Sequence, residues 1–459
     1  MRILEVSTFF KQVGGAEIYM HQVTEALRAR GHEVAMFAGS PDEARDEELL
    51  RVVQRPDFHA GHLVHDPELS AALAEFAARF QPDLVHLHNT YSFPSDFPAE
   101  LAKLGVPITQ TVHDWSLLCT NAWCVVPPSE TEEFRVCEGG PGKKCFERGC
   151  EANYPFDARV VLAAVLRLEA ARGAVTNYTA PSAFLANMLA DHDLGPSHAL
   201  PLWIEPESFG GQEVFERALA EVTREPHRML FVGRLDKEKG LVHLIEALPA
   251  ILREVPTAHL SLVGDGTEVD ALKARARELD VTSAVTFHGR VPHEEVVRFM
   301  ARAAVQVLPS VWCENSPLTC YESLLAGLPM AASRIAGLPA MVRPGETGVL
   351  FEPRDPASIA SALVELFQDP ELHAKLVAGC RADVARYSKL AHLDALLEIF
   401  EQARELGPKE PSWNADLAAA THGVLVKAKE VEDWANGMNA HIGQLMKSKV
   451  KGLVDKLRG

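Results

Sequence analysis

The chain has 459 residues, of which 47% are hydrophobic and 24% charged, and its formal net charge is −18. One hydrophobic core rarely serves more than about 250–300 residues, so we expect at least two domains. The negative charge excludes binding of nucleic acid or anionic lipid by the molecule as a whole, because both interactions rely on positive charge.

Residues 1–10 place Glu5 inside a short apolar run. The sequence has no uninterrupted apolar stretch of about 18 residues, the length that spans a bilayer. We therefore expect a cytoplasmic protein. Any contact with the inner face of the cell membrane would have to be local and peripheral.

The N-terminal part alternates strand-like and helix-like segments. Apolar runs at 2–8, 32–39, 83–89 and 107–114 read as strands, and the helical segment before the second run ends at Gly31. Such alternation predicts a parallel sheet covered by helices on both faces.

The pattern pauses at 195–211, a stretch rich in Pro, Gly and Ser, and then restarts. Short apolar runs ending in Gly or Ser recur at 228–233, 259–266, 284–289 and 304–310. We therefore predict an α/β protein with a Rossmann-like domain at 1–200, a linker at 201–211 and a second Rossmann-like domain at 212–385. Two such domains create a cleft, and ligands of parallel sheets bind beyond the carboxyl ends of the strands.

The sequence changes character in the predicted helical tail at 411–459. Apolar residues recur every seven positions on two seams, at Val424, Val431, Met438 and Leu445 and at Ala428, Ala435 and Ile442. The last 13 residues carry five Lys or Arg against one Asp. Three interpretations stay open for 424–459: a surface-packed helix, a self-associating coiled coil, and a basic contact with an anionic membrane.

The segment ENSPLTCYE at 314–322 places two glutamates around a helix start. Ser316 is predicted as the N-cap, with Pro317 in the first helical position. The free N–H groups of Leu318 and Thr319 would then form an anion site. Glu314 would lie before the helix and Glu322 just over one turn inside it, so that each carboxylate could reach a different part of one long ligand. The alternative is that both are solvated charges.

A second motif, FVGRLDKEKG at 231–240, ends a strand at Gly233 and places Arg234 and Lys239 at the same cleft. Two cations at a strand end suit a diphosphate. The alternative is a surface ion-pair cluster with Asp236 and Glu238, which would contribute little.

A third motif, VGGAE at 13–17, places Gly14 and Gly15 before a helix, where backbone N–H groups can approach a phosphate or sugar.

Together these residues resemble the retaining GT-B-fold glycosyltransferases of family 4. The likeness covers most of residues 1–400 and is densest in 231–353, where GRLDKEKG, LVGDG, HGRVPHEEV, the E-x7-E pair and GLPAMVRPGETGVLFEPRDP follow one another in the family's order. The resemblance implies two Rossmann-like domains that face a cleft, with residues 386–410 forming a helix that returns toward the N-terminal domain.

The resemblance also implies roles for individual residues. Glu322 would bind the ribose of a nucleotide-sugar donor, Arg234 and Lys239 its diphosphate, and Glu314 and His113 its sugar. The resemblance also implies that Gly14 and Gly15 cover the donor, while Ser316, Leu318, Thr319 and Gly233 are expected to line its site from their places at the helix start and the strand end. Arg, Lys and the helix dipole would stabilise the leaving diphosphate, so that no catalytic metal is needed.

The sequence departs from the family at Ala340, where members often carry a glutamate. The backbone N–H groups of Gly337 and Leu338 could still serve the donor sugar. An Asp-His-Asp triplet at 191–193 matches the metal-binding motif of another glycosyltransferase class, but it follows a helical segment and we interpret it as chance.

Five of the eight cysteines fall in an insert at 119–150. Cys119, Cys137, Cys145 and Cys150 match best a cysteine-bearing insert in some family members, and four thiolates could hold a structural zinc ion. Reduced, unliganded cysteines and an iron-sulfur cluster are the alternatives. Because the insert adjoins the N-terminal side of the cleft, we expect it to shape the acceptor site.

The leading hypothesis is a retaining glycosyltransferase that moves a sugar from a nucleotide-sugar donor to a glycan, lipid-linked or small-molecule acceptor. The rivals are a sugar-nucleotide epimerase of the same fold and an inactive scaffold protein. Neither the base nor the sugar of the donor can be read from the sequence.

Overall fold

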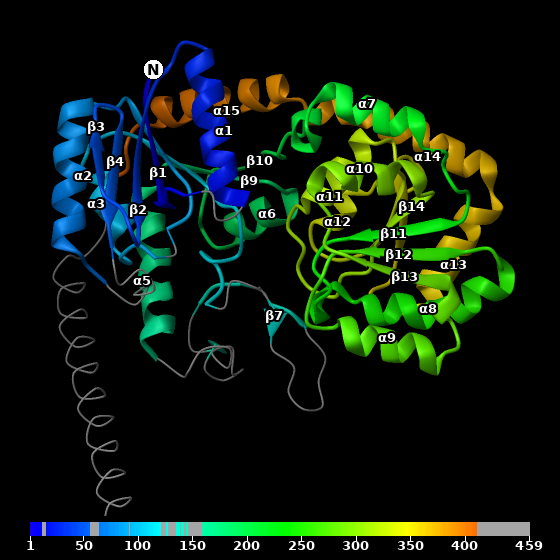
Figure 1. Ribbon diagram of the computed structural model, residues 1–459. Helices are drawn as coiled ribbons and strands as arrows, with labels where there is room; N and C mark the ends of the chain where they lie inside the picture. Colours follow the sequence, from blue (N-terminus) through cyan, green and yellow to red (C-terminus); the bar gives the residue numbers. More distant parts are fainter. Residues whose placement is uncertain are drawn as a thin grey trace, which may run out of the picture.

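The protein consists of two α/β halves that lie side by side (Figure 1). The structure, a computed structural model, describes residues 1–11, 15–55, 64–90, 92–120, 125–126, 135–137, 139–141, 144–145 and 158–410. Gly14, Cys150 and the tail at 411–459 with its heptad positions therefore lie outside the described residues. None of the described helices is long and apolar enough to cross a bilayer.

The N-terminal half is built on an eight-stranded sheet in the order β10-β9-β6-β5-β1-β2-β4-β3, parallel except for the β3–β4 pair. Its strands are β1 (Arg2–Phe9), β2 (Glu33–Ser40), β3 (Arg45–Glu47), β4 (Leu50–Gln54), β5 (Leu84–Leu87), β6 (Ile108–Thr111), β9 (Asn177–Ala180) and β10 (Ser197–Ala199). Its helices are α1 (Gly15–Ala29), α2 (Pro67–Phe80), α3 (Phe97–Ala102), α5 (Ala158–Ala174) and α6 (Ala183–Asp191). A separate small hairpin pairs β7 (Val125–Val126) with β8 (Arg135–Val136).

The C-terminal half is built on a parallel six-stranded sheet in the order β13-β12-β11-β14-β15-β16. Its strands are β11 (Arg228–Val232), β12 (His259–Val263), β13 (Val285–Gly289), β14 (Val305–Leu308), β15 (Met330–Ser333) and β16 (Gly348–Phe351). Its helices are α7 (Gln212–Glu221), α8 (Leu241–Glu254), α9 (Val269–Glu278), α10 (His293–Arg302), α11 (Leu318–Leu325), α12 (Leu338–Met341), α13 (Pro356–Gln368) and α14 (Pro370–Asp383). Single 3₁₀ turns at Pro206–Phe209, Lys237–Lys239, Thr282–Ala284 and Val384–Tyr387 complete it.

These two sheets confirm the predicted fold class. The strand order reverses between β1 and β5 in one sheet and between β11 and β14 in the other. At such switch points the connecting loops diverge beyond the carboxyl ends of the strands and leave room for a ligand. The predicted motifs at 231–240 and 314–322 follow β11 and β14, so that both lie at the C-terminal switch point.

The last described helix, α15 (Lys389–Leu406), leaves the C-terminal half and packs against α1 and β6 of the N-terminal half (Figure 1). Leu393, Leu396, Ile399 and Phe400 of α15 share a hydrophobic core with Ile3, Val23 and Leu27. The chain therefore crosses between the halves twice, once before α7 and once before α15.

Candidate active site

Two cavities lie between the halves. The first, which we call the His113 cavity, has a volume of about 400 Å³ and is lined by Asn89, His113 and Trp115 of the N-terminal half and by residues 312–318 of the C-terminal half. The second, the Glu322 cavity, has a volume of about 330 Å³ and is lined by residues that include Tyr19, Trp203, His293 and Glu322. Gly15, Leu202 and Leu318 line both cavities.

The start of α11 differs from its prediction. Ser316 is not the N-cap: Pro317 occupies that position with an extended ψ of 126°, the helix begins at Leu318, and within the described chain no side chain caps it. The Ser316 hydroxyl instead lies 2.6 Å from the Tyr321 hydroxyl. An uncapped start leaves the first N–H groups, those of Leu318 and Thr319, without intrahelical partners, and these groups together with the helix dipole favour an anion.

The two glutamates of this segment lie in different cavities. Glu314 lines the His113 cavity and Glu322 the Glu322 cavity, and both side chains are buried. Glu314 Oε1 accepts hydrogen bonds from Lys239 Nζ at 2.8 Å and from Ser310 Oγ at 2.7 Å. Glu322 Oε1 lies 2.8 Å from His293 Nε2, and this hydrogen bond raises the pKa of His293. Neither carboxylate is a solvated surface charge.

The two predicted diphosphate ligands differ in their surroundings. Lys239 is 17% exposed, bonds to Glu314 and lies 5.0 Å from the ring centre of Trp312. Arg234 is 61% exposed and pairs with Asp236 and with Glu238 at 2.8 Å. Gly233, at the end of β11, has a φ of 150°, a conformation that L side chains rarely adopt.

Asn315 connects the two halves. Its side-chain amide donates to the backbone carbonyl of His113 at 2.9 Å, and its Oδ1 accepts from Ser182 Oγ at 2.6 Å. Beside it, the indole N–H of Trp115 donates to the carbonyl of Cys313 at 3.0 Å. These bonds hold the loop after β14 against the loop after β6.

The segment around Ala340 corrects one expectation. The N–H of Gly337 already donates to the carbonyl of Glu314 at 2.8 Å, and that of Leu338 donates to the carbonyl of Ile335 at 3.2 Å. A Cβ on Gly337 would lie 2.0 Å from the carbonyl oxygen of Asn315, so the two loops touch backbone to backbone. Neither N–H is therefore available to a donor sugar in this structure.

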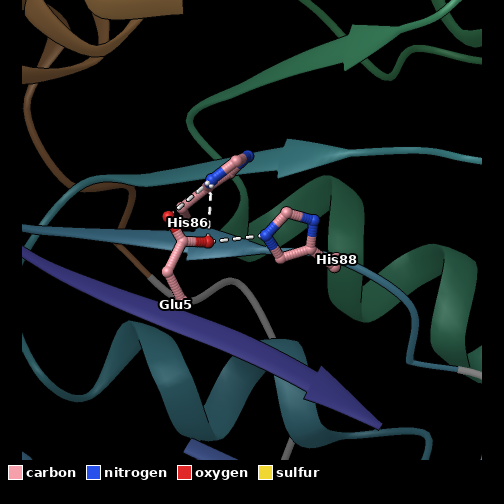
Figure 2. Close-up of side chains that lie close together, drawn as sticks. All are labelled: Glu5, His86 and His88. Carbon is pink, nitrogen blue, oxygen red and sulfur yellow. Dashed lines mark hydrogen bonds and ion pairs between the residues drawn. The ribbon is translucent and has the colours of Figure 1, made fainter. Parts of the chain in front are cut away.

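His113 is half-buried at the wall of its cavity, and its Nε2 lies 3.1 Å from Nδ1 of the buried His88. Behind His88, the side chains of Glu5 and His86 complete a buried polar cluster, which Figure 2 shows in close-up. Burial, followed by the neighbouring His88 and His86, lowers the pKa of His113 well below its usual value, so that the ring is neutral near pH 7.

The cysteine insert gives no support to a zinc site. Cys119 and Cys137 are buried in the N-terminal core, and Cys145 packs with Val161. Among the described residues, no group with the spacing of metal ligands contains a cysteine. Cys150, the fourth predicted ligand, lies outside them.

Three contributors to this site were missed. Asn315 has no sequence signal beyond its place between Glu314 and the helix start. His293 lies on α10, and the chain order does not show that this helix packs beside the predicted Glu322 of α11. The polar cluster did leave a signal, because Glu5 interrupts an apolar strand and two histidines alternate with apolar residues at 84–88.

Two family models match consecutive parts of the chain. Residues 13–207 match the family model Glycosyltransferase Family 4, and residues 215–382 match Glycosyl transferases group 1. A D-inositol 3-phosphate glycosyltransferase of Acidothermus cellulolyticus is 28% identical over 415 residues, which cover 85% of this chain and 86% of that enzyme. A glycogen synthase of Mycobacterium tuberculosis is 40% identical over 145 residues, but this match covers 32% of this chain and only 35% of the synthase.

A solved structure extends the likeness to the fold. Anabaena HepE in complex with UDP has a TM-score of 0.59 and 16% identity, over 88% of this chain and 100% of that protein. Two Rossmann-like domains around a cleft are the architecture of the GT-B fold, and the family matches define a glycosyltransferase of class EC 2.4. The chain belongs to glycosyltransferase family 4, whose members are retaining enzymes that use nucleotide-sugar donors and in general need no metal ion for catalysis.

Proposed function

We propose that this protein binds a nucleoside diphosphate sugar across the start of α11 and transfers the sugar, with retention of configuration, to a glycan, lipid-linked or small-molecule acceptor. The observation that carries the proposal is the division of the E-x7-E pair between two cavities, with the uncapped helix start of Leu318 shared by both. The diphosphate would lie at Leu318, with the donor sugar toward Glu314 and the ribose toward Glu322.

The proposed roles follow from charge and position. As the bond between the sugar and the diphosphate breaks, negative charge grows on the phosphate, and Lys239, Arg234 and the start of α11 would stabilise it. Lys239 is held by its bond to Glu314, which lines the His113 cavity, so its ammonium is preorganised behind that residue. Arg234 would have to exchange its ion pairs with Asp236 and Glu238 for the phosphate, which the exposure of its side chain permits.

His113 and Glu314 would orient the donor sugar from opposite sides of the His113 cavity. Gly15, at the N-terminus of α1, lines both cavities and supports the proposal that this loop covers the donor. Gly14, Ser316 and Thr319 are proposed as further donor contacts on their sequence positions alone.

The proposal is tested by measuring thermal stabilisation with UDP, GDP, ADP and their sugars, and then by following sugar release. UDP is the first candidate because HepE was solved with it. A ligand at 100 times its Kd adds about 2.7 kcal/mol of stability. Stabilisation by one diphosphate, followed by transfer to an acceptor with retained configuration, supports the proposal. Conversion of the donor without any acceptor would indicate an epimerase, and absence of both binding and turnover would indicate a scaffold.

We also propose that the insert at 119–150 shapes the acceptor site. Trp115 and Leu118, which precede it, belong to the core that reaches Cys313 at the His113 cavity. Replacing Cys119, Cys137, Cys145 and Cys150 by serine should change the KM for the acceptor; a zinc content that falls at the same time would restore the zinc hypothesis. Unchanged metal content and unchanged acceptor kinetics would refute both.

We make a separate proposal for residues 424–459. The enzyme would be cytoplasmic, and this tail would either hold it at the membrane surface or join it to a second copy of the chain. It is supported by the basic end and the heptad positions of the sequence. Sedimentation with anionic vesicles and a mass measurement in solution, each with the chain ended after residue 410 as the control, distinguish these alternatives from a simple packed helix.

A further inference from the structure

A buried cluster of polar side chains lies behind His113. Glu5 comes from β1, His86 from β5 and His88 from the residue after β5, and all three are buried in the sheet (Figure 2). Glu5 Oε2 lies 2.6 Å from His88 Nε2 and 3.0 Å from His86 Nδ1. Removing three such groups from water costs several kcal/mol unless they are fully hydrogen-bonded.

The cluster is a hydrogen-bonded network and not a metal site. Its ligand atoms lie within 4.8 Å of one another, as those of a metal site would. However, two ligands bound tetrahedrally to one zinc ion at about 2.0–2.1 Å are about 3.3 Å apart. The contact of 2.6 Å between Glu5 and His88 is too short for that and fits a charge-assisted hydrogen bond.

The proton positions in this network can be assigned in order. Burial alone would raise the pKa of Glu5, but attraction to His86 and hydrogen bonds from both histidines outweigh it and hold the pKa at about 2. Glu5 is therefore a carboxylate and can only accept hydrogen bonds. It follows that His88 carries a proton on Nε2.

The same reasoning extends to His113. Burial, followed by the neighbouring His86, lowers the pKa of His88 to about 4, so that His88 is neutral and its Nδ1 is a lone pair. The 3.1 Å contact between this atom and His113 Nε2 needs one proton, which His113 must supply. A neutral His113 with its proton on Nε2 presents Nδ1 as a hydrogen-bond acceptor. Within the described chain no hydrogen bond occupies that Nδ1.

The other end of the network holds Glu5 in place. His86 Nε2 lies 2.7 Å from Thr111 Oγ1, which lies 2.7 Å from Thr179 Oγ1. The rings of Phe400 and Tyr19 pack edge-on against His86 and His88, with centroids 5.0 and 5.9 Å away. Replacing a buried charged cluster by apolar side chains of similar volume often leaves a protein equally stable or more stable. The stability of the fold therefore gives no reason for a carboxylate at position 5.

We propose that Glu5 and His88 are positioning residues that fix His113 as the tautomer protonated on Nε2, so that its Nδ1 accepts a hydrogen bond from a hydroxyl of the donor sugar. This inference rests on the proposed function for the identity of the ligand, but the assignment of the tautomer does not. A fixed acceptor selects a sugar with a hydroxyl at that place, because a derivative that lacks it leaves a polar atom unpaired.

The first test is the tautomer of His113 in the ligand-free protein, read from two-bond ¹H–¹⁵N correlations of protein labelled on histidine and assigned with His113→Gln. We expect a neutral ring protonated on Nε2. A ring protonated on Nδ1, or on both nitrogens at pH 7, overturns the proposal. This measurement needs no ligand, so it still decides the tautomer if the chain binds no nucleoside diphosphate and the proposed function fails.

The second test distinguishes a role in positioning His113 from a role in stabilising the fold. It compares the affinity for UDP with the affinity for the UDP-sugar that stabilises the protein most. Glu5→Gln and His88→Phe should weaken the UDP-sugar by about two- to tenfold, the range of one hydrogen bond, and leave UDP unchanged. Thr179→Val is the matched control, because it removes a buried hydroxyl from the same network beyond His86. If both variants keep the wild-type ratio of the two affinities, or if Thr179→Val changes it as much, the proposal is wrong.

Discussion

The side-chain amide of Asn315, in the C-terminal half, donates to the backbone carbonyl of His113 in the N-terminal half at 2.9 Å. This bond joins the segment that carries the two glutamates to the residue proposed to face the donor sugar. It therefore couples the separation of the halves to the geometry of the site.

Asn315→Asp should loosen this contact. The carboxylate still accepts from Ser182 but no longer donates to His113, and a carbonyl left unpaired costs about 1–3 kcal/mol. We expect faster hydrogen exchange in residues 113–118, measured by mass spectrometry, and a lower kcat/KM. Ser182→Ala keeps the bond to His113 and should leave exchange in 113–118 nearly unchanged. Equal exchange in Asn315→Asp and wild type would refute the coupling.

Glu322→Ala should weaken nucleotide binding. If Glu322 binds ribose through charge-assisted hydrogen bonds, the affinity for the stabilising diphosphate should fall by about 1.5–3 kcal/mol in calorimetry. Glu295→Ala, an exposed residue of the neighbouring helix α10, is the control. Unchanged affinity in a folded Glu322→Ala protein would remove Glu322 from the ribose site.

Lys239→Ala and Arg234→Ala should lower kcat by about 10²–10³, as expected when a cation that stabilises the transition state is lost. Arg253→Ala removes a cation that is 73% exposed and paired with Glu254 on α8, and should have little effect. A loss of kcat of tenfold or less would mean that the residue belongs to a surface ion pair. The two variants are measured separately, because Arg234 already pairs with two acidic residues at the surface.

Acid should destabilise the attachment of α15. His392 bonds to the Tyr19 hydroxyl and to the Pro201 carbonyl, each at 2.7 Å, and faces Trp203. Burial, only partly offset by the bond to Pro201, lowers the pKa of His392 to about 4. Because the unfolded chain takes up the proton near pH 6.5 and the folded chain does not, stability present above pH 6.5 is lost as the pH falls toward 4.

The free energy of unfolding should fall by about 3 kcal/mol through His392 alone, and His88 should lower it further. Urea unfolding at pH 7, 5.5 and 4.5 measures it. His392→Gln keeps both hydrogen bonds without a titrating group, so its stability should fall less over this range. If the free energy of unfolding falls equally with pH in the variant and the wild type, His392 is not the group responsible.

The sequence predicts the fold well because its signals are local. The strands at 228–233, 259–266 and 304–310 are buried apolar runs that end where the chain must turn, and the ends of β11 and β14 place their motifs at one cleft. Ser316 was wrong as the N-cap because Pro317 keeps an extended ψ, which no propensity of serine reveals.

The parts of the site that could not be predicted depend on contacts between distant segments. Glu5 and His88 are 83 positions apart, and Asn315 reaches His113 across 202. A buried carboxylate in an apolar strand signals that some partner exists but does not name it. The β3–β4 edge was also missed, because its short, exposed strand has no apolar period.

The two crossings between the halves lie against each other. The N–H of Ile204 in the first crossing donates to the carbonyl of Tyr387 in the second at 3.2 Å, and Lys389 pairs with Glu205 at 3.7 Å. Because the two crossings are bonded to each other, a change in the angle between the halves would have to bend both at the same place. Bending at that place would separate the loops on the cleft side, so we expect any opening of the halves to lengthen the bond between Asn315 and His113.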